Sequence, residues 1–431
     1  MEFIKKYKIW FFIIGFVLLM VFGTTIFSNI RKTVTLTVWG TNFTDEQFDI
    51  LSRNIKGTSR NGIKFVYTEI KQDDYETELM SSFIHSESPD IFLMNNEQIG
   101  KFKKLVSPLN LANKNYNINN LKKDYPTIIE EESVLENQLY MLPISIDSLV
   151  LYYNRNIFDS LSIPNPPKTW PDLLKLISTL RQLDAYNRIS RSPIAMGTGK
   201  NVTNSPDILS LLIMQLNGKI INTAEQRVTV NERVRLNDTY INAGEEALAF
   251  YAQFAQSNNQ YYSWNNSFEN DLDAFANNKL AIYIGYRSDK EKIIKKNSNL
   301  NFGISEMPQI NIDQNINFGK FFGFTVSSQS KNTEVAWEAL NLLMSASNVK
   351  NIIDFSKLPP ANRQLINEYY NDNDLSIFAK QALNSKSFYH PNNESLKDIF
   401  IKIIDKANTD RNYRNAISEL SQDLTNLMYK N

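Results

Sequence analysis

The chain has 431 residues, 42% hydrophobic and 21% charged, which is typical of a globular protein with two or three domains. Lys and Arg number 46, as do Asp and Glu, so no net charge favours nucleic acid as a partner. The absence of cysteine excludes disulfides, thiolate nucleophiles, cysteine-bound metal and a lipid on an N-terminal cysteine, and two histidines are too few for a histidine-rich metal centre, so we expect neither metal nor cofactor.

The N-terminal run from Ile9 to Phe27 is uncharged and mostly apolar. A helix needs about 20 such residues to cross a bilayer, so we expect residues 1–32 to form a short cytoplasmic stub and a transmembrane anchor. The rest of the chain would then be extracytoplasmic, as a single-pass protein of the cell membrane. A cleaved secretory signal is the alternative, although its small-residue cleavage pattern is poor here.

Strand and helix patterns then alternate. Extended, β-branched segments predict strands over 34–40, 62–68 and 89–95. The pair Thr44 and Gln47 has capping-box spacing for a first helix, and 73–84 predicts a second. Strands separated by helices imply right-handed βαβ units and a largely parallel sheet.

The segment from Tyr140 to Asn154 is strand-like but contains Asp147 between two apolar halves. An unpaired buried carboxylate is costly, so the side chain needs either water or a partner. An edge strand facing water and a strand facing a binding cleft both satisfy this requirement.

The remaining chain continues the alternation. We expect a helix capped by Thr169, a helix capped by Ser205 and ended before Gly218, a helix opened by Ser288 with Glu291, a strand over 318–328 and a helix starting near Asn332 or Thr333. The last eighty or so residues have a mostly helical pattern. His85 and His390 lie near turn-forming residues, and we expect both at the surface without a role.

Motifs for common enzymes are missing. The "GTGKN" segment lacks the earlier glycine and the Ser or Thr that a P-loop needs, and no serine-hydrolase or zinc-protease motif occurs. A carboxylate pair for glycoside hydrolysis has no fixed spacing, so Asp147 with Glu269 or Asp273 stays open as an alternative.

Aromatic and small polar residues gather at predicted strand ends and helix starts. In open α/β sheets ligands bind beyond the carboxyl ends of strands, and sugars need flat rings for their apolar faces and amides or carboxylates for their hydroxyls. The tryptophans could instead pack in a core, and the asparagines could cap helices. These candidate ligand residues are Trp39, Thr41, Asn95, Asn96, Trp264, Tyr286 and Arg287.

Several segments in order resemble bacterial extracellular solute-binding proteins of the maltose-binding cluster. They are "LYMLPISIDSLVLYYNRNIFDSLSIPNPPKTWPDLLKL", "VTLTVWG", "PDIFLMN", "FANNKLAIYIGY", "FGKFFGFTVSSQSKNTEVAWEALNLLM" and "LPPANR". The resemblance implies an α/β, two-lobed periplasmic-binding-protein fold of type II with about three hinge crossings. We assign 33–145 plus 320–352 to lobe 1 and 146–319 plus 353–431 to lobe 2.

The resemblance also implies site residues. Asp147 matches an acidic residue that contacts sugar hydroxyls in the family, whereas Tyr286 and Arg287 replace its Pro-Trp. Phe318 in the return crossover and Arg363 in the late loop join the candidate ligand set.

The function implied is a non-enzymatic receptor of an ABC importer that binds a mono- or oligosaccharide by hinge closure and partners permease subunits. An anchored glycan-acting enzyme and an adhesion or sensor subunit are the alternatives.

Overall fold

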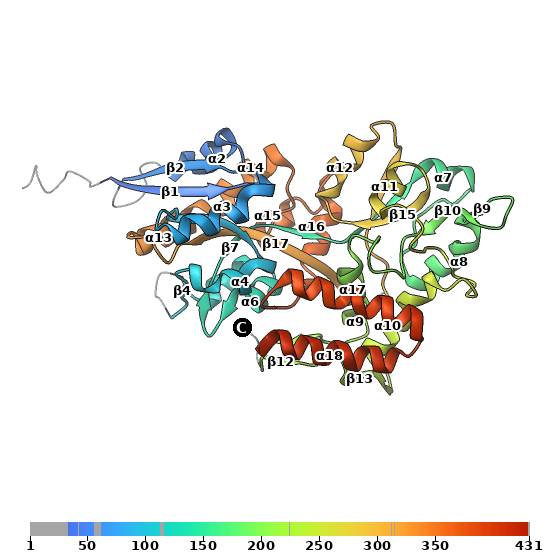
Figure 1. The fold of residues 1–431 in the computed structure, drawn as a ribbon. Helices are drawn as coiled ribbons and strands as arrows, with labels where there is room; N and C mark the ends of the chain where they lie inside the picture. The colour runs from blue at the N-terminus through green and yellow to red at the C-terminus, as the bar shows by residue number, and fades with distance from the viewer. Residues whose placement is uncertain are drawn as a thin grey trace, which may run out of the picture.

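The computed structural model describes residues 33–41, 43–55, 62–112, 116–223, 225–311, 313 and 315–429. These residues form two α/β lobes side by side, joined by long strands (Figure 1). The predicted anchor, Ile9 to Phe27, lies outside the described residues. Within the described ranges, none of the helices combines the length and apolar character that a bilayer crossing requires.

The first lobe is built on a six-stranded sheet with the order β18-β17-β3-β1-β2, and β7 also pairs with β17. The three predicted strands are confirmed, with bounds shifted by one or two residues, and β1 pairs in parallel with both β2 and β3. The strands are β1 (Val34–Gly40), β2 (Ile63–Glu69), β3 (Ile91–Asn95), β7 (Leu142–Ser148), β17 (Asn317–Val326) and β18 (Ser385–Lys386).

Helices and a small three-stranded sheet surround this first sheet. The Thr44 capping box is confirmed, because Thr44 Oγ1 accepts from Gln47 N and the Gln47 side chain accepts from Thr44 N. The helical elements are α2 (Asp45–Ser52), η1 (Arg53–Ile55), α3 (Gln72–Ile84), η2 (Asn96–Gln98), α4 (Ile99–Phe102), η3 (Lys103–Leu105), α5 (Ile118–Asp124), α6 (Thr127–Ser133), α13 (Thr333–Leu343), α14 (Ala346–Ser356), α15 (Arg363–Glu368) and α16 (Ser376–Ala382). The small sheet joins β4 (Leu109–Asn110), β6 (Gln138–Leu139) and β5 (Val134–Leu135).

The second lobe has a five-stranded sheet with the order β16-β8-β15-β10-β9. Only β10 and β15 pair in parallel, while β8 and β9 run antiparallel to their neighbours. The expected largely parallel sheet is therefore wrong for this lobe, because β8 enters from the first lobe in the opposite direction. The strands are β8 (Val150–Asn154), β9 (Gln182–Leu183), β10 (Ile189–Ile194), β15 (Leu280–Gly285) and β16 (Phe302–Ser305).

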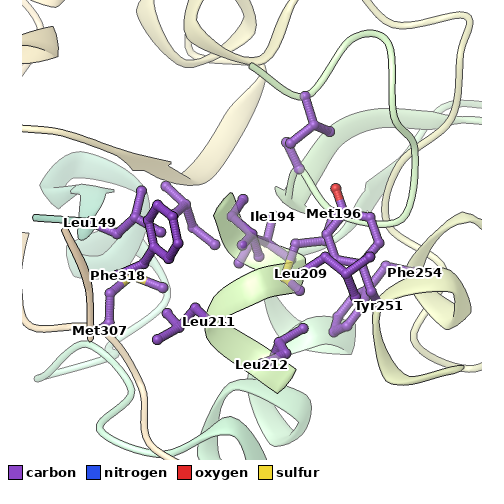
Figure 2. Packing of buried hydrophobic residues seen from close by; sticks show 14 of the residues in the cluster. Leu149, Ile194, Met196, Leu209, Leu211, Leu212, Tyr251, Phe254, Met307 and Phe318 are labelled. Atoms are coloured by element: carbon purple, nitrogen blue, oxygen red, sulfur yellow. The ribbon is translucent and has the colours of Figure 1, made fainter. Parts of the chain in front are cut away.

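Helix α9 (Ser205–Gln215) runs through the middle of the second lobe and is buried at every position. Figure 2 shows Leu209, Leu211 and Leu212 on this helix, surrounded by side chains from neighbouring elements. The remaining elements are α7 (Arg155–Ser160), α8 (Trp170–Leu180), α10 (Ala243–Ala252), η4 (Gln253–Ala255), α11 (Asp271–Ala276), α12 (Asp289–Lys296), α17 (Asn393–Asp410), α18 (Tyr413–Tyr429) and the hairpins β11 (Ile221–Asn222) with β12 (Arg227–Val228) and β13 (Arg233–Leu236) with β14 (Thr239–Asn242).

Of the helix caps predicted in this lobe, Thr169 is confirmed and Ser205 is wrong. Thr169 caps α8, with its hydroxyl accepting from Asp172 N at 3.2 Å. Ser205 is not a cap but the first residue of α9, and its hydroxyl donates to Gly199 O at 2.8 Å. The serine stabilises the preceding glycine loop instead of the helix end.

The chain passes between the lobes three times. It leaves the first core after Ile146 and enters the second at Leu149, and it returns along β17, where Phe318 belongs to the second core and Phe321 to the first. The third passage follows α16. These crossings place the ends of β3, β7 and β15 at one junction between the lobes.

The assignment of residues 353–431 to lobe 2 is wrong for its first part. Ile353, Ala361 and Leu365 lie in the first core, and α16 contributes Ala379 to that core and Phe378 to the second. Helical patterns show that a face is apolar without showing which lobe covers it. The chain returns to the second lobe only after α16.

Candidate functional site

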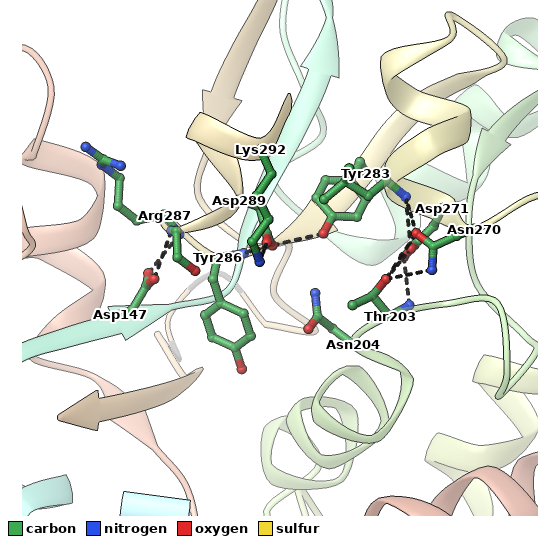
Figure 3. Close-up of polar contacts among 12 residues, drawn as sticks. Asp147, Thr203, Asn204, Asn270, Asp271, Tyr283, Tyr286, Arg287, Asp289 and Lys292 are labelled. Carbon is green, nitrogen blue, oxygen red and sulfur yellow. Dashed lines mark hydrogen bonds and ion pairs between the residues drawn. The ribbon is translucent and has the colours of Figure 1, made fainter. Parts of the chain in front are cut away.

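Asp147 lies near the end of β7, at the junction of the lobes, and its carboxylate binds the turn that leads into helix α12 of the second lobe. Oδ1 accepts from Arg287 N at 2.8 Å and Oδ2 accepts from Ser288 N at 3.1 Å (Figure 3). Ser288 is the N-cap of α12, but its side chain makes no capping hydrogen bond, so the predicted pair with Glu291 is wrong. A carboxylate at a helix N-terminus also interacts favourably with the helix dipole.

Removal from water raises the pKa of Asp147 to about 6, although its two backbone hydrogen bonds act in the opposite direction. The nearby Asp289 carboxylate raises the pKa further. Asp147 is therefore a partnered charge between the lobes and not an edge residue in free water.

The turn after β15 carries Tyr286 and Arg287 and is held from several sides. Asp289 Oδ2 accepts from Tyr283 Oη at 2.9 Å and from Tyr286 N at 3.0 Å, and Tyr286 O accepts from Tyr152 Oη at 2.6 Å. Gly285 permits this approach, because a Cβ there would lie 2.7 Å from Asp289 Oδ2. The turn is thus a rigid platform that presents the Tyr286 ring away from Asp147 (Figure 3).

Next to this platform, a lysine joins two carboxylates. Lys320 Nζ, on β17, lies 3.0 Å from Glu97 Oε1 and 2.7 Å from Asp207 Oδ2. Tyr286 Oη donates to the same Asp207 oxygen at 2.8 Å, and the Lys320 ammonium lies 4.9 Å from the centre of the Tyr286 ring. Sequence reasoning missed Glu97, Asp207 and Lys320.

Lys320 and Glu97 stabilise each other's charged form. Burial lowers the pKa of Lys320, but Asp207 and Glu97 more than offset this, and the net pKa is raised. Burial likewise raises the pKa of Glu97, but Lys320 and Lys397 outweigh it, and the net pKa is lowered. Both groups are therefore ionised at neutral pH.

Asn95, Asn96 and Phe318 also lie at this junction. Asn96 is 5% exposed, and its side chain bonds to Glu132 Oε2, Ser387 Oγ and Phe321 N, so it supports the framework. Asn95 N donates to Gln98 Oε1, whereas its own amide oxygen has no partner in the described structure. Phe318 packs edge-on against Phe388.

These side chains leave little space. A cavity of about 10 Å³, lined among others by Asn96, Asp207, Phe318 and Lys320, lies between them. That volume holds about one water molecule. Ligand binding at this point therefore requires the lobes to move apart.

The other predicted residues lie elsewhere. Trp264 is fully buried in the second core, where it stacks on Phe268 and donates to Asn201 Oδ1, so its ring has no surface open to a ligand. Arg363 Nε donates to Tyr125 O in the first lobe. Trp39 is half-buried against the first core, with Thr41 just beyond the end of β1.

His390 is not a surface residue as expected. It is 6% exposed, Phe388 O lies 3.0 Å from its Nδ1, and burial lowers its pKa. Its neighbouring turn residues suggested exposure, but the turn folds inward at the junction. His85 is exposed.

A larger groove of about 1110 Å³ also lies between the lobes. Lys101 and Glu132 line it from the first lobe, and Met214 and Ile220 from the second. It contains none of the ten residues predicted from the sequence. Among the described residues, no group of three or more His, Cys, Asp or Glu side chains is arranged to hold a metal ion.

Comparison with known families finds one match over most of the chain. Residues 56–375 match the model of the family described as bacterial extracellular solute-binding protein. A protein of Brucella abortus named as a binding protein is 22% identical over 256 residues, which is 57% of this chain and 57% of that relative. The match thus spans little more than half the length of these curated relatives.

Solved structures share the fold at low sequence identity. The cyclic α-maltosyl-1,6-maltose binding protein of Arthrobacter globiformis has a TM-score of 0.74 at 15% identity, covering 93% of this chain and 100% of that one. The maltose-binding protein of Listeria monocytogenes gives 0.69 at 18%, covering 92% and 98%. A solute-binding protein of Thermotoga lettingae with bound α-D-tagatose gives 0.67 at 18%, covering 92% and 100%.

Proposed function

The chain belongs to the bacterial extracellular solute-binding protein family, and we propose that it is the receptor of an ABC importer that binds a carbohydrate between its lobes. The main support is the family match, which spans 56–375 and so includes the junction of Glu97, Asp147, Asp207 and Lys320. Three structural neighbours are named for, or hold, sugars. Hinge motion about the three crossings would admit the ligand.

The proposed ligand contacts come from both lobes. Asn95 has a free amide oxygen, Glu97 and Asp207 supply carboxylates, and Tyr286 and Phe318 supply rings, which together suit hydroxyl-bearing ligands with apolar faces. Trp39, Thr41 and Arg287 would join them when the lobes move. Trp264 is left out because it is buried.

Catalysis is not part of the proposal. Both Asp147 oxygens accept backbone hydrogen bonds, Glu269 pairs with Lys279, and Asp273 pairs with Lys296. The acids considered as a glycosidase pair thus all have partners. Incubation with oligosaccharides followed by product analysis would reveal turnover if this assignment were wrong.

We further propose that the run from Ile9 to Phe27 anchors the protein in the membrane, with the described lobes outside the cytoplasm. An anchor would raise the receptor's effective concentration at a permease. Membrane fractionation and N-terminal sequencing of the mature protein test this. Recovery of a mature chain that starts after Phe27 would contradict it.

The carbohydrate assignment is tested by calorimetry on the full-length chain in detergent with mono- and oligosaccharides. We expect at least one sugar to bind, and Asn95→Ala to weaken that binding by about 1–2 kcal/mol, because the free amide oxygen would otherwise accept a ligand hydroxyl. Asn301→Ala, at an exposed position in the second lobe, is the matched control and should bind normally. Tight binding of an amino acid and of no sugar would contradict the proposal.

A further inference from the structure

Four charged side chains of alternating sign lie in a row at the boundary between the lobes. Asp207 contacts Lys320, Lys320 contacts Glu97, and Lys397 Nζ lies 3.8 Å from Glu97 Oε1. We propose that these four residues form an ionic latch that holds the lobes closed, so that ionic strength and local charge set the fraction of closed molecules.

The two inner members of the latch move with the first lobe. Glu97 lies on η2, directly after β3, and its neighbour Asn96 accepts from Phe321 N, which fixes η2 to β17. Lys320 pairs with Asp147 across β17 and β7. Hence Glu97 and Lys320 form one unit on the first-lobe side of the hinge.

The two outer members belong to the second lobe. Asp207 is on α9, which is buried in the second core, and Lys397 is on α17, whose Leu396 and Phe400 pack in the same core. Opening the lobes therefore separates Asp207 from Lys320 and Lys397 from Glu97. The bond between Lys320 and Glu97 remains, because both partners move together.

Burial makes the two Lys320 contacts stronger than ordinary surface pairs, whereas the Lys397 side chain is 42% exposed and its contact with Glu97 is the weaker one. The side chains of Asp207, Glu97 and Lys320 are 9%, 15% and 21% exposed, so solvent screens them only in part. Each separated charge regains water when the lobes open, which limits the net gain from closure. A closed state held this way responds to salt, whereas one held by apolar packing alone does not weaken with salt.

A second observation at the same boundary agrees with this. Lys290 on α12 lies 3.9 Å from Asp374, whose neighbour Leu375 packs in the first core. Charges of opposite sign thus face each other across the lobes at two places. The Lys290–Asp374 pair is more exposed, at 30% and 61%, and surface pairs of this kind contribute little to the stability of the closed state.

The test measures lobe separation in the full-length chain without any ligand, so its outcome is independent of the carbohydrate proposal. The chain has no cysteine, and Ile84 and Tyr186, on different lobes, are 77% and 79% exposed. Ile84→Cys and Tyr186→Cys therefore accept a pair of dyes for single-molecule energy transfer. We expect added salt to shift molecules from the closed to the open distance.

The latch variants are Asp207→Asn and Lys397→Met. Each should lower the closed-to-open ratio, by about tenfold for the more buried Asp207 and by less for Lys397, and should reduce the salt response. Lys402→Met is the matched control. Lys402 lies on α17, as Lys397 does, but it pairs with Glu419 and Asp423 of α18 within the second lobe. Lys402→Met should leave the closed-to-open ratio and its salt response unchanged.

Thermal unfolding of each variant shows whether it is folded before its lobe distance is interpreted. A closed population in Lys397→Met and Asp207→Asn equal to that of the unaltered chain, with the same salt response, would overturn the latch. An equal shift in Lys402→Met would also overturn it, since the effect would then be unspecific. Opening confined to the latch variants supports it.

Discussion

At the scale of single residues, Asp147 shows how a charge in an apolar strand is stabilised from far along the chain. Its carboxylate accepts N–H groups from Arg287 and Ser288, 140 and 141 residues further on. The sequence indicates that the charge needs compensation, because an unpaired buried carboxylate is costly. It does not identify the donors, which are backbone atoms with no residue signature.

Glu132 is a second buried acid, and it makes stability depend on pH. Ser387 Oγ donates to it at 2.6 Å and Asn96 Nδ2 at 3.2 Å, yet burial raises its pKa from 4.5 to about 7. The folded state thus binds this proton more tightly than the unfolded state. The stabilisation is complete below pH 4.5 and is lost as the pH rises through 7.

We therefore expect Glu132→Gln to raise the free energy of unfolding, relative to the unaltered chain, more at pH 8 than at pH 5. A neutral amide keeps one acceptor and adds a donor for Ser387, and the upper bound of the gain is about 3 kcal/mol at about 1.4 kcal/mol per pKa unit. Urea unfolding at the two pH values measures it. Glu130→Gln, on the same helix but half-exposed and paired with Lys122, is the control. An equal pH effect in both variants would contradict this role of Glu132.

At the scale of elements, helix starts divide into those with local and those with distant caps. Thr44 and Thr169 were predictable as caps, because each threonine hydroxyl accepts from an N–H group only three residues further along the chain. The contact that fixes the start of α12 was not predictable, because the Asp147 carboxylate that accepts from Arg287 N and Ser288 N comes from β7. The same limit applies to the site: strand ends were found at Asn95 and Tyr286, but Lys320 appeared only as one residue of an aromatic strand.

The pairing of β17 with β7 depends on Gly323, where the register between the strands shifts. A Cβ at Gly323 would collide with Leu142 O and lie 2.6 Å from Pro143 Cα, and backbone atoms cannot rotate away. We expect Gly323→Ala to lower the free energy of unfolding by about 1–3 kcal/mol. Gly62→Ala is the control, since its Cβ would meet only Thr33 Oγ1, at 3.5 Å. Chemical denaturation compares them, and equal stability of the two variants would argue against the collision.

At the scale of the whole molecule, the two-lobed α/β fold followed from ordered strand and helix patterns and from the family resemblance. What the patterns did not contain was the allocation of late helices to lobes. Ala361 and Leu365 look like any apolar positions of a helical region, and only their three-dimensional neighbours place them in the first core. Long-range packing decides such questions, and local periodicity is silent on it.

One buried side chain ties the start of the third crossing to the end of the first and to the loop that precedes β17. Gln381, 1% exposed at the end of α16, donates from Nε2 to Leu149 O at 3.2 Å and accepts at Oε1 from Met307 N at 3.0 Å. Leu149 ends the first crossing, Met307 lies in the second core before β17 begins, and Gln381 precedes the third crossing. The amide thus links the end of α16, at the boundary of the lobes, to two segments of the second lobe.

We expect Gln381→Met to cost about 2 kcal/mol, because Met307 N then lacks its partner in a buried place while the side-chain volume is nearly kept. It should also make the lobes exchange amide hydrogens independently, which peptide-level hydrogen exchange measures for each lobe. Gln215→Met is the control: Gln215 is equally buried and bonds Trp170, Pro308 and Ile316 within the second lobe. That variant should lose protection in the second lobe alone. If Gln381→Met also affected one lobe only, the amide would be a local contact, and the coupling of the lobes would have to come from β7 and β17.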